Sequence, residues 1–146
     1  MVKIYVSSVV DAPAERVWDH IRDFNGLPKW HPAIADSRIE GNQPADKVGC
    51  VRSFRTSDGG AIRERLMALS DYEYGCTYSI LESPMGVSNY IATVRLIPIT
   101  DGDRTFCEWT AEFECDPARE RELREFIGQG VFQAGFDALK RHFARR

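Results

Sequence analysis

Apolar and polar residues alternate with a period of two through most of the middle of the chain, from Ile34 to Cys115. Along residues 107–114, Cys, Trp, Ala and Phe take the odd positions, and Glu, Thr, Glu and Glu take the even ones. This alternation is typical of antiparallel strands with one face toward the core and one toward water. Together with an apolar run at 3–10, the pattern predicts seven strands: 3–10, one that starts near Ile34, 48–56, 61–70, 74–81, 87–97 and 104–115. Residues 57–60, Ser-Asp-Gly-Gly, predict a tight hairpin loop between two of them.

Helical spacing follows the first predicted strand. Pro13 suits a first helical turn, because its missing N–H would have no partner there. Apolar residues then recur at i, i+4 and i+7 from Val17, and Asn25-Gly26 predicts the helix end. Residues 27–32 contain two prolines, so we expect a turn or a short irregular helix there.

Residues 117–146 are predicted to form one long helix that starts at Asp116-Pro117. At 100° per residue, its apolar residues fall into two sets on nearly opposite sides. Either the helix bends at Gly128-Gln129-Gly130, or its C-terminal half is covered on two sides. The first set is Leu123, Phe126, Ile127 and Val131, and the second is Phe132, Phe136, Leu139 and Phe143.

Composition restricts the class of protein. The 146 residues are 43% apolar and 28% charged, which is typical of one soluble globular domain, 1–146, and argues against disorder and membrane spans. A net charge of −3 argues against a nucleic-acid partner. The N-terminus lacks the features of a signal peptide, and the four cysteines have no C-x-x-C spacing, so we expect reduced thiols in a cytoplasmic protein. The three histidines lack zinc-site spacing, and no phosphate loop or G-x-S-x-G motif occurs, so neither a metal nor a cofactor is expected.

The order of elements, with the motifs Ala12-Pro13-Ala14-Glu15-Arg16-Val17-Trp18 and Trp30-His31-Pro32, resembles the START-like (Bet v 1-like, SRPBCC) superfamily. Within it, the chain is similar over essentially its whole length to the bacterial polyketide cyclase/dehydrase and lipid-transport family. Further similar segments are Arg63-Glu64-Arg65-Leu66, Ser88-Asn89-Tyr90 and Glu108-Trp109. The resemblance implies an α+β helix-grip fold: a curved seven-stranded antiparallel sheet wrapped around a long C-terminal helix, with two short helices after the first strand. It also implies an elongated pocket with Trp30-His31-Pro32 at its mouth, but the scaffold serves several functions, so function must be argued from the site.

Strand parity predicts which residues line that pocket. Two arginines are easier to leave in water than to bury, so on strand 61–70 we place Arg63 and Arg65 outward. Ile62, Glu64, Leu66 and Ala68 then face inward, as do the odd positions of 107–115. The predicted ligand-binding residues are Trp30, His31, Arg52, Phe54, Glu64, Tyr78, Tyr90, Trp109, Phe113 and Phe132.

Two of these residues have alternative interpretations. Glu64 either forms a structural cross-strand pair with Arg52 or faces a ligand, because an unpaired buried carboxylate is costly. His31 is either a turn residue with a solvated imidazole, which we favour, or an acid–base group at the pocket mouth.

The leading hypothesis is a carrier or sensor that binds a hydrophobic or amphipathic small molecule, such as a lipid, a quinone or an aromatic polyketide, in an internal cavity. The alternative is a cyclase or dehydratase-type enzyme whose candidate acid–base residues are Glu64, His31, Tyr78 and Tyr90. A third hypothesis is an interaction module without a usable cavity, for which a homodimer is one form.

Overall fold

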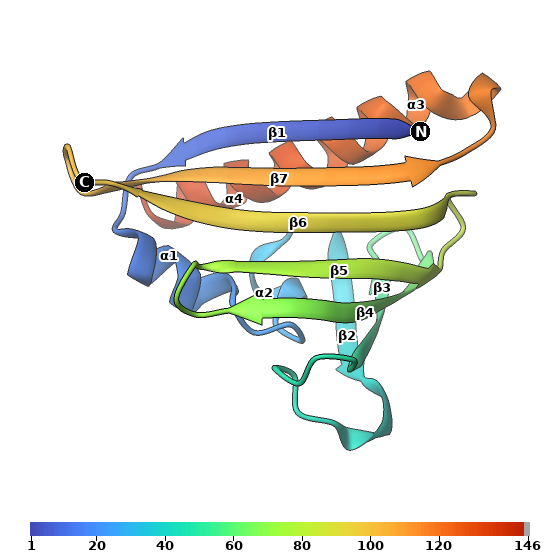
Figure 1. The fold of residues 1–146 in the computed structure, drawn as a ribbon, viewed down its shortest axis with the longest axis horizontal. Coiled ribbons are helices and arrows are strands. Elements are labelled where there is room, and N and C mark those ends of the chain that lie inside the picture. The colour runs from blue at the N-terminus through green and yellow to red at the C-terminus, as the bar shows by residue number, and fades with distance from the viewer. Residues whose placement is uncertain (145–146) are drawn as a thin grey trace.

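The structure, a computed structural model, describes residues 1–144 and contains a seven-stranded antiparallel sheet in the order β1-β7-β6-β5-β4-β3-β2. Apart from β1, each strand pairs with its neighbour in sequence, and β1 closes the other edge against β7 (Figure 1). The sequence prediction of seven antiparallel strands is therefore confirmed. The strands are β1 (Val2–Val10), β2 (Ile34–Ile39), β3 (Val51–Thr56), β4 (Ala61–Ser70), β5 (Gly75–Glu82), β6 (Ser88–Ile99) and β7 (Arg104–Glu114).

Helices cover one side of this sheet. The two short helices predicted after the first strand are α1 (Ala14–Ile21) and α2 (Leu27–Trp30). The C-terminal helix runs along β1 and β7 in Figure 1 and contacts β1 most often. The result is the predicted α+β helix-grip fold. The remaining segments are the 3₁₀ turns η1 (Glu40–Asn42) and η2 (Pro117–Arg119), then α3 (Glu120–Glu125), the π-helix η3 (Phe126–Gln133) and α4 (Ala134–His142).

The π-helix explains the change of apolar phase along the C-terminal helix. The fully buried positions Leu123, Ile127, Phe132 and Phe136 are spaced by four, five and four residues. A step of five matches the i→i+5 bonding of a π-helix, so Ile127 and Phe132 share one face. The two apolar sets are therefore explained without a helix that is covered on two sides and without a sharp bend. Phe126 lies off this face and is 47% exposed.

Strand parity holds for the inner face of β6 and β7 but fails at one end of β4. Ala68, expected inward, is exposed, while Leu69 packs against the core. The cause is a bulge opposite β5 between Leu66 and Ala68, which shifts the register by one residue. Cys115, also expected inward, lies just beyond β7, where it is half-buried and packs against the core.

Candidate functional site

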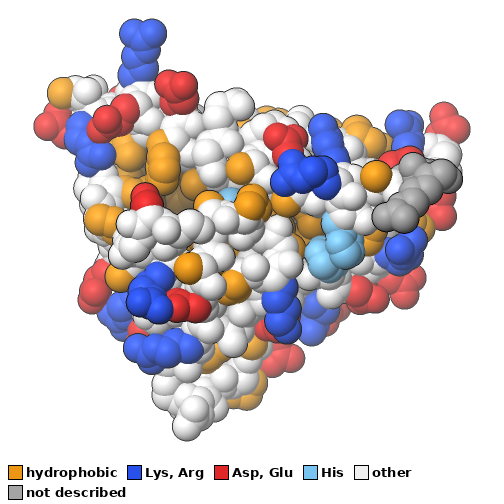
Figure 2. Space-filling view, turned by 180° about the vertical axis from the view of Figure 1, so that it is seen from behind, with side chains coloured by type: hydrophobic (Ala, Val, Ile, Leu, Met, Phe, Trp, Pro, Cys, Tyr) orange, Lys and Arg blue, Asp and Glu red, His pale blue; other side chains and the backbone are white. Residues whose placement is uncertain are grey.

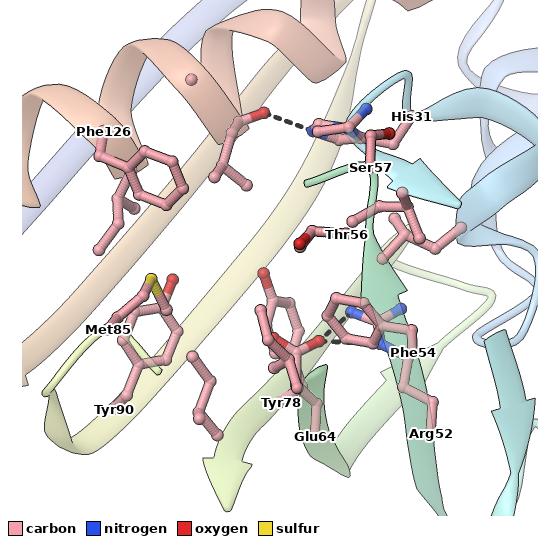
Figure 3. A pocket seen from close by; sticks show the side chains of 18 of the residues that line it. His31, Arg52, Phe54, Thr56, Ser57, Glu64, Tyr78, Met85, Tyr90 and Phe126 are labelled. Atoms are coloured by element: carbon pink, nitrogen blue, oxygen red, sulfur yellow. Dashed lines mark hydrogen bonds and ion pairs between the residues drawn. The ribbon is translucent and has the colours of Figure 1, made fainter. Parts of the chain in front are cut away.

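A cavity with a volume of about 220 Å³ lies between the sheet and the π-helix. Hydrophobic side chains surround a hollow on the face shown in Figure 2. The lining residues come from six strands, from the β3–β4 and β5–β6 loops, from the α2 region and from η3 (Figure 3). They are Leu27, His31, Ala33, Ile34, Arg52, Phe54, Thr56, Ser57, Asp58, Ile62, Glu64, Tyr78, Ile80, Met85, Tyr90, Trp109, Phe126, Ile127, Gly130 and Val131.

Seven of the ten predicted ligand-binding residues line this cavity: His31, Arg52, Phe54, Glu64, Tyr78, Tyr90 and Trp109. The other three do not line it, and each packs against a residue that does. Phe132 stacks on Trp109 with ring centroids 4.4 Å apart, and Trp30 lies 6.0 Å from the same indole. Phe113 stacks on the Tyr90 ring at 5.6 Å. These three rings therefore hold the side chains of Trp109 and Tyr90 in place along the cavity.

Sequence reasoning missed the residues at the two sides of the opening. Thr56 is the last residue of β3, and Ser57 and Asp58 belong to the hairpin loop that follows, whose sequence predicted only a turn. Phe126 and Val131 lie on the π-helix. The sequence analysis named them only as apolar helix positions, in the same set as Leu123 and Ile127. Helical spacing alone did not separate them from these two buried residues.

Arg52 and Glu64 form a buried ion pair across β3 and β4, where they are direct partners in the register. Nε and Nη2 of Arg52 both donate to the same oxygen, Oε1 of Glu64, at 2.9 and 2.6 Å. Nη1 donates to the carbonyl of Phe24 at 3.0 Å, and the guanidinium lies 4.0 Å from the Phe24 ring centroid. The structural-pair interpretation therefore describes Arg52 well, because cross-strand, backbone and aromatic contacts all hold it in place.

Glu64 retains capacity for a further contact. Within residues 1–144 its second oxygen, Oε2, takes part in no hydrogen bond. Every side-chain polar atom there that is fully shut off from solvent has a partner, so Oε2 is not fully shut off. Since Glu64 lines the cavity, Oε2 is the oxygen that the cavity can reach. Burial raises the pKa of Glu64, and the charge of Arg52 opposes that rise. Glu64 thus both pairs with Arg52 and offers an acceptor to the cavity.

Tyr78 and Tyr90 direct their hydroxyl groups into the same space (Figure 3). The Tyr78 oxygen accepts a bond of 3.0 Å from Nε1 of Trp109, which leaves its own O–H as a donor. The Tyr90 hydroxyl has no hydrogen-bond partner within the described chain. Burial raises the pKa of both phenols, that of Tyr78 strongly, so both remain protonated at neutral pH.

His31 is 1% exposed, so the expectation of a solvated turn imidazole is wrong. Nδ1 accepts from the amide of Ala33 at 3.1 Å, which places the proton on Nε2, and Nε2 donates to the carbonyl of Val131 at 2.7 Å. Desolvation lowers the pKa of His31 despite that bond, so the ring is neutral. Both nitrogens are engaged, and the ring joins the segment after α2 to the π-helix.

Other chemistries find no support among the described residues. The thiols of Cys50, Cys76, Cys107 and Cys115 are all free, and burial raises the pKa of Cys76 to about 11. Residues 1–144 contain no group of three or more His, Cys, Asp or Glu placed to hold a metal ion. No helix in that range has the length and hydropathy to cross a membrane.

Comparison with known proteins places the chain in a family. Residues 1–144 match the family described as polyketide cyclase / dehydrase and lipid transport. The structure of the protein XoxI from Bacillus cereus is 31% identical, covering 98% of this chain and 96% of that one with a TM-score of 0.87. At the level of fold alone, the Zhui aromatase/cyclase from Streptomyces sp. R1128 is similar at 20% identity, covering 99% and 94% with a TM-score of 0.79. Norcoclaurine synthase from Thalictrum flavum in complex with dopamine and hydroxybenzaldehyde is likewise 20% identical, covering 97% and 85% with a TM-score of 0.73. The cavity under the π-helix thus lies in a chain that belongs to the polyketide cyclase/dehydrase and lipid-transport family.

Proposed function

We propose that this chain is one ligand-binding domain that holds a hydrophobic or amphipathic small molecule in the cavity as a carrier or sensor. The observation that carries the proposal is the division of the cavity wall into apolar surface and a few unsatisfied polar groups. Phe54, Trp109 and Ile127 offer apolar surface, while the hydroxyl of Tyr90 makes no hydrogen bond within residues 1–144. This combination is typical of small-molecule sites, where apolar contact supplies affinity and a few polar groups set orientation.

A thermal-shift screen tests the proposal, with fatty acids, quinones, sterol-like compounds and aromatic polyketides as the probes. A ligand at about 100 times its Kd adds about 2.7 kcal/mol, which corresponds to a rise in Tm of roughly 5–10 °C for a chain of this size. Hits are then titrated by quenching of Trp109 fluorescence, since this indole lines the cavity. A screen with no hit in any class contradicts the proposal.

The matched variant for each hit is Tyr90→Phe. It removes a hydroxyl that has no partner in residues 1–144, so the fold should keep its stability. Loss of one hydrogen bond to the ligand should weaken binding about two- to tenfold. Unchanged affinity would show that Tyr90 does not hold the polar end of that ligand.

The second candidate function is cyclase or dehydratase-type catalysis in the same cavity. It is supported by Glu64, a carboxyl with a raised pKa that lines the cavity beside two protonated tyrosines. A Glu64 carboxyl could exchange a proton with a carbonyl-rich substrate while Tyr78 and Tyr90 donate hydrogen bonds to it. His31 fits an acid–base role less well, because both of its nitrogens are occupied. Turnover of a bound polyketide that persists unchanged in Glu64→Gln would exclude this mechanism.

A further inference from the structure

The charged groups around the cavity leave no cation available for a ligand. Arg52 is the one arginine or lysine that lines the cavity in the described chain, and its charge is matched by Glu64 at 2.6 Å. Its guanidinium is further held by the Phe24 carbonyl and lies near three aromatic rings. His31 also lines the cavity, but as a neutral ring. Arg119 donates to the carbonyl of Met85 at the rim and is itself paired with Glu122.

A carboxylate lies at the edge of the cavity instead. Asp58 is exposed in the β3–β4 loop and accepts from the Thr56 hydroxyl and from the Gly60 amide at 3.2 Å. These bonds lower the pKa of Asp58, so it stays ionised. The charges of Arg52 and Glu64 cancel, so the lining residues carry a net charge of −1, which comes from Asp58.

The hydrogen-bonding groups in the interior suit an uncharged partner. Tyr78 and Tyr90 can each donate an O–H, and Oε2 of Glu64 can accept. A carbonyl oxygen fits the donors, and a hydroxyl group fits donor and acceptor together. An anion would lose its hydration there, would face Glu64 and would find no opposite charge.

We propose that the cavity selects neutral aromatic or apolar molecules whose polar end is a carbonyl or hydroxyl group, and that it discriminates against carboxylates and other anions. This selectivity rests on the proposed ligand-binding function of the same site. Arg52 then serves to neutralise Glu64 rather than to bind an acidic ligand. Asp58 and Glu64 are the residues that determine specificity.

The test compares two fluorescent probes with the same anilinonaphthalene body: neutral N-phenyl-1-naphthylamine and anionic 1-anilinonaphthalene-8-sulfonate. Binding is followed by energy transfer from tryptophan, and competition between the probes establishes that they share the cavity. We expect the neutral probe to bind about tenfold more tightly or better, because the sulfonate must be desolvated without a counter-charge.

Two variants test whether negative charge at the cavity causes the weaker binding of the sulfonate. Asp58→Asn keeps an acceptor for the Gly60 amide but removes the charge at the edge, so it should strengthen sulfonate binding about two- to fivefold at low salt. Glu64→Gln unpairs Arg52 and should strengthen sulfonate binding further, with little change for the neutral probe. Glu73→Gln is the control, since Glu73 is exposed and does not line the cavity.

The outcomes separate the two proposals. Equal affinity of the competing probes contradicts the selectivity while leaving ligand binding supported. Sulfonate binding that is unchanged in Asp58→Asn contradicts the assigned electrostatic cause, and this variant does not disturb the buried pair. Absence of binding by both probes contradicts the proposed function together with the selectivity.

Discussion

Removal of Arg52 should destabilise the protein strongly, because it leaves the carboxylate of Glu64 buried without a counter-charge. Arg52→Met preserves much of the side-chain volume but loses both bonds to Glu64, at 2.6 and 2.9 Å, and the bond of 3.0 Å to the Phe24 carbonyl. Breaking a buried pair in this way costs about 3–5 kcal/mol. For a chain of this length that lowers Tm by roughly 6–20 °C.

Urea unfolding monitored by tryptophan fluorescence measures this loss. Arg55→Met is the matched control, because Arg55 lies on the same strand and pairs with Asp36 where both side chains are exposed. Its loss should cost less than about 1 kcal/mol. The double variant Arg52→Met/Glu64→Leu removes both charges and should recover much of the loss, apart from the unpaired Phe24 carbonyl. A double variant no more stable than Arg52→Met would refute the reasoning.

The pH dependence of Arg52→Met provides a second check. Burial already raises the pKa of Glu64, and without Arg52 nothing opposes that rise. Between the ordinary pKa of Glu, about 4.3, and the raised value, the folded state binds more protons than the unfolded state. The free energy of unfolding should therefore increase as the pH falls from neutral toward that ordinary value. A variant whose stability stays flat over this window would contradict a buried, unpaired Glu64.

Five further variants test the packing, the histidine and the tyrosines around the cavity. Gly135→Ala should cost about 1–3 kcal/mol in chemical unfolding, because its Cβ would lie 3.0 Å from the His31 ring and from an indole carbon. Gly128→Ala, whose Cβ would meet its nearest atom at 3.8 Å, should instead be neutral or stabilise by up to about 1 kcal/mol. Burial lowers the pKa of His31, so below about pH 6.5 the unfolded state binds more protons and acidification should lower Tm, with a smaller slope in His31→Gln. Tyr78→Phe leaves an indole N–H unpaired and should cost about 1–3 kcal/mol, whereas Tyr90→Phe should leave the urea midpoint unchanged.

The sequence determined the sheet and most of its inner face. Local alternation is set by the period of the strand, so the odd positions of 107–113 and the even positions of 90–96 could be assigned to the inner face without coordinates. The same parity placed Glu64 inward and made Arg52 its neighbour, and the register confirms both. Motifs spread over the whole chain also indicated the family.

Only the tertiary structure decided features that depend on contacts between distant segments. The bulge that turns Ala68 outward arises from the pairing of β4 with β5. The imidazole of His31 is held by hydrogen bonds to the amide of Ala33 and to the carbonyl of Val131, which lies a hundred residues away in the sequence. The π-helix lets Phe126 and Val131 border the cavity while it keeps Ile127, which also lines the cavity, on the same buried face as Phe132. The hydrogen bonds of a regular helix span four residues, and those of a π-helix span five. Packing against the sheet can select between the two, whereas a sequence analysis that assumes 100° per residue cannot detect the change. The sequence therefore predicted seven of the residues that line the cavity, and packing decided the rest.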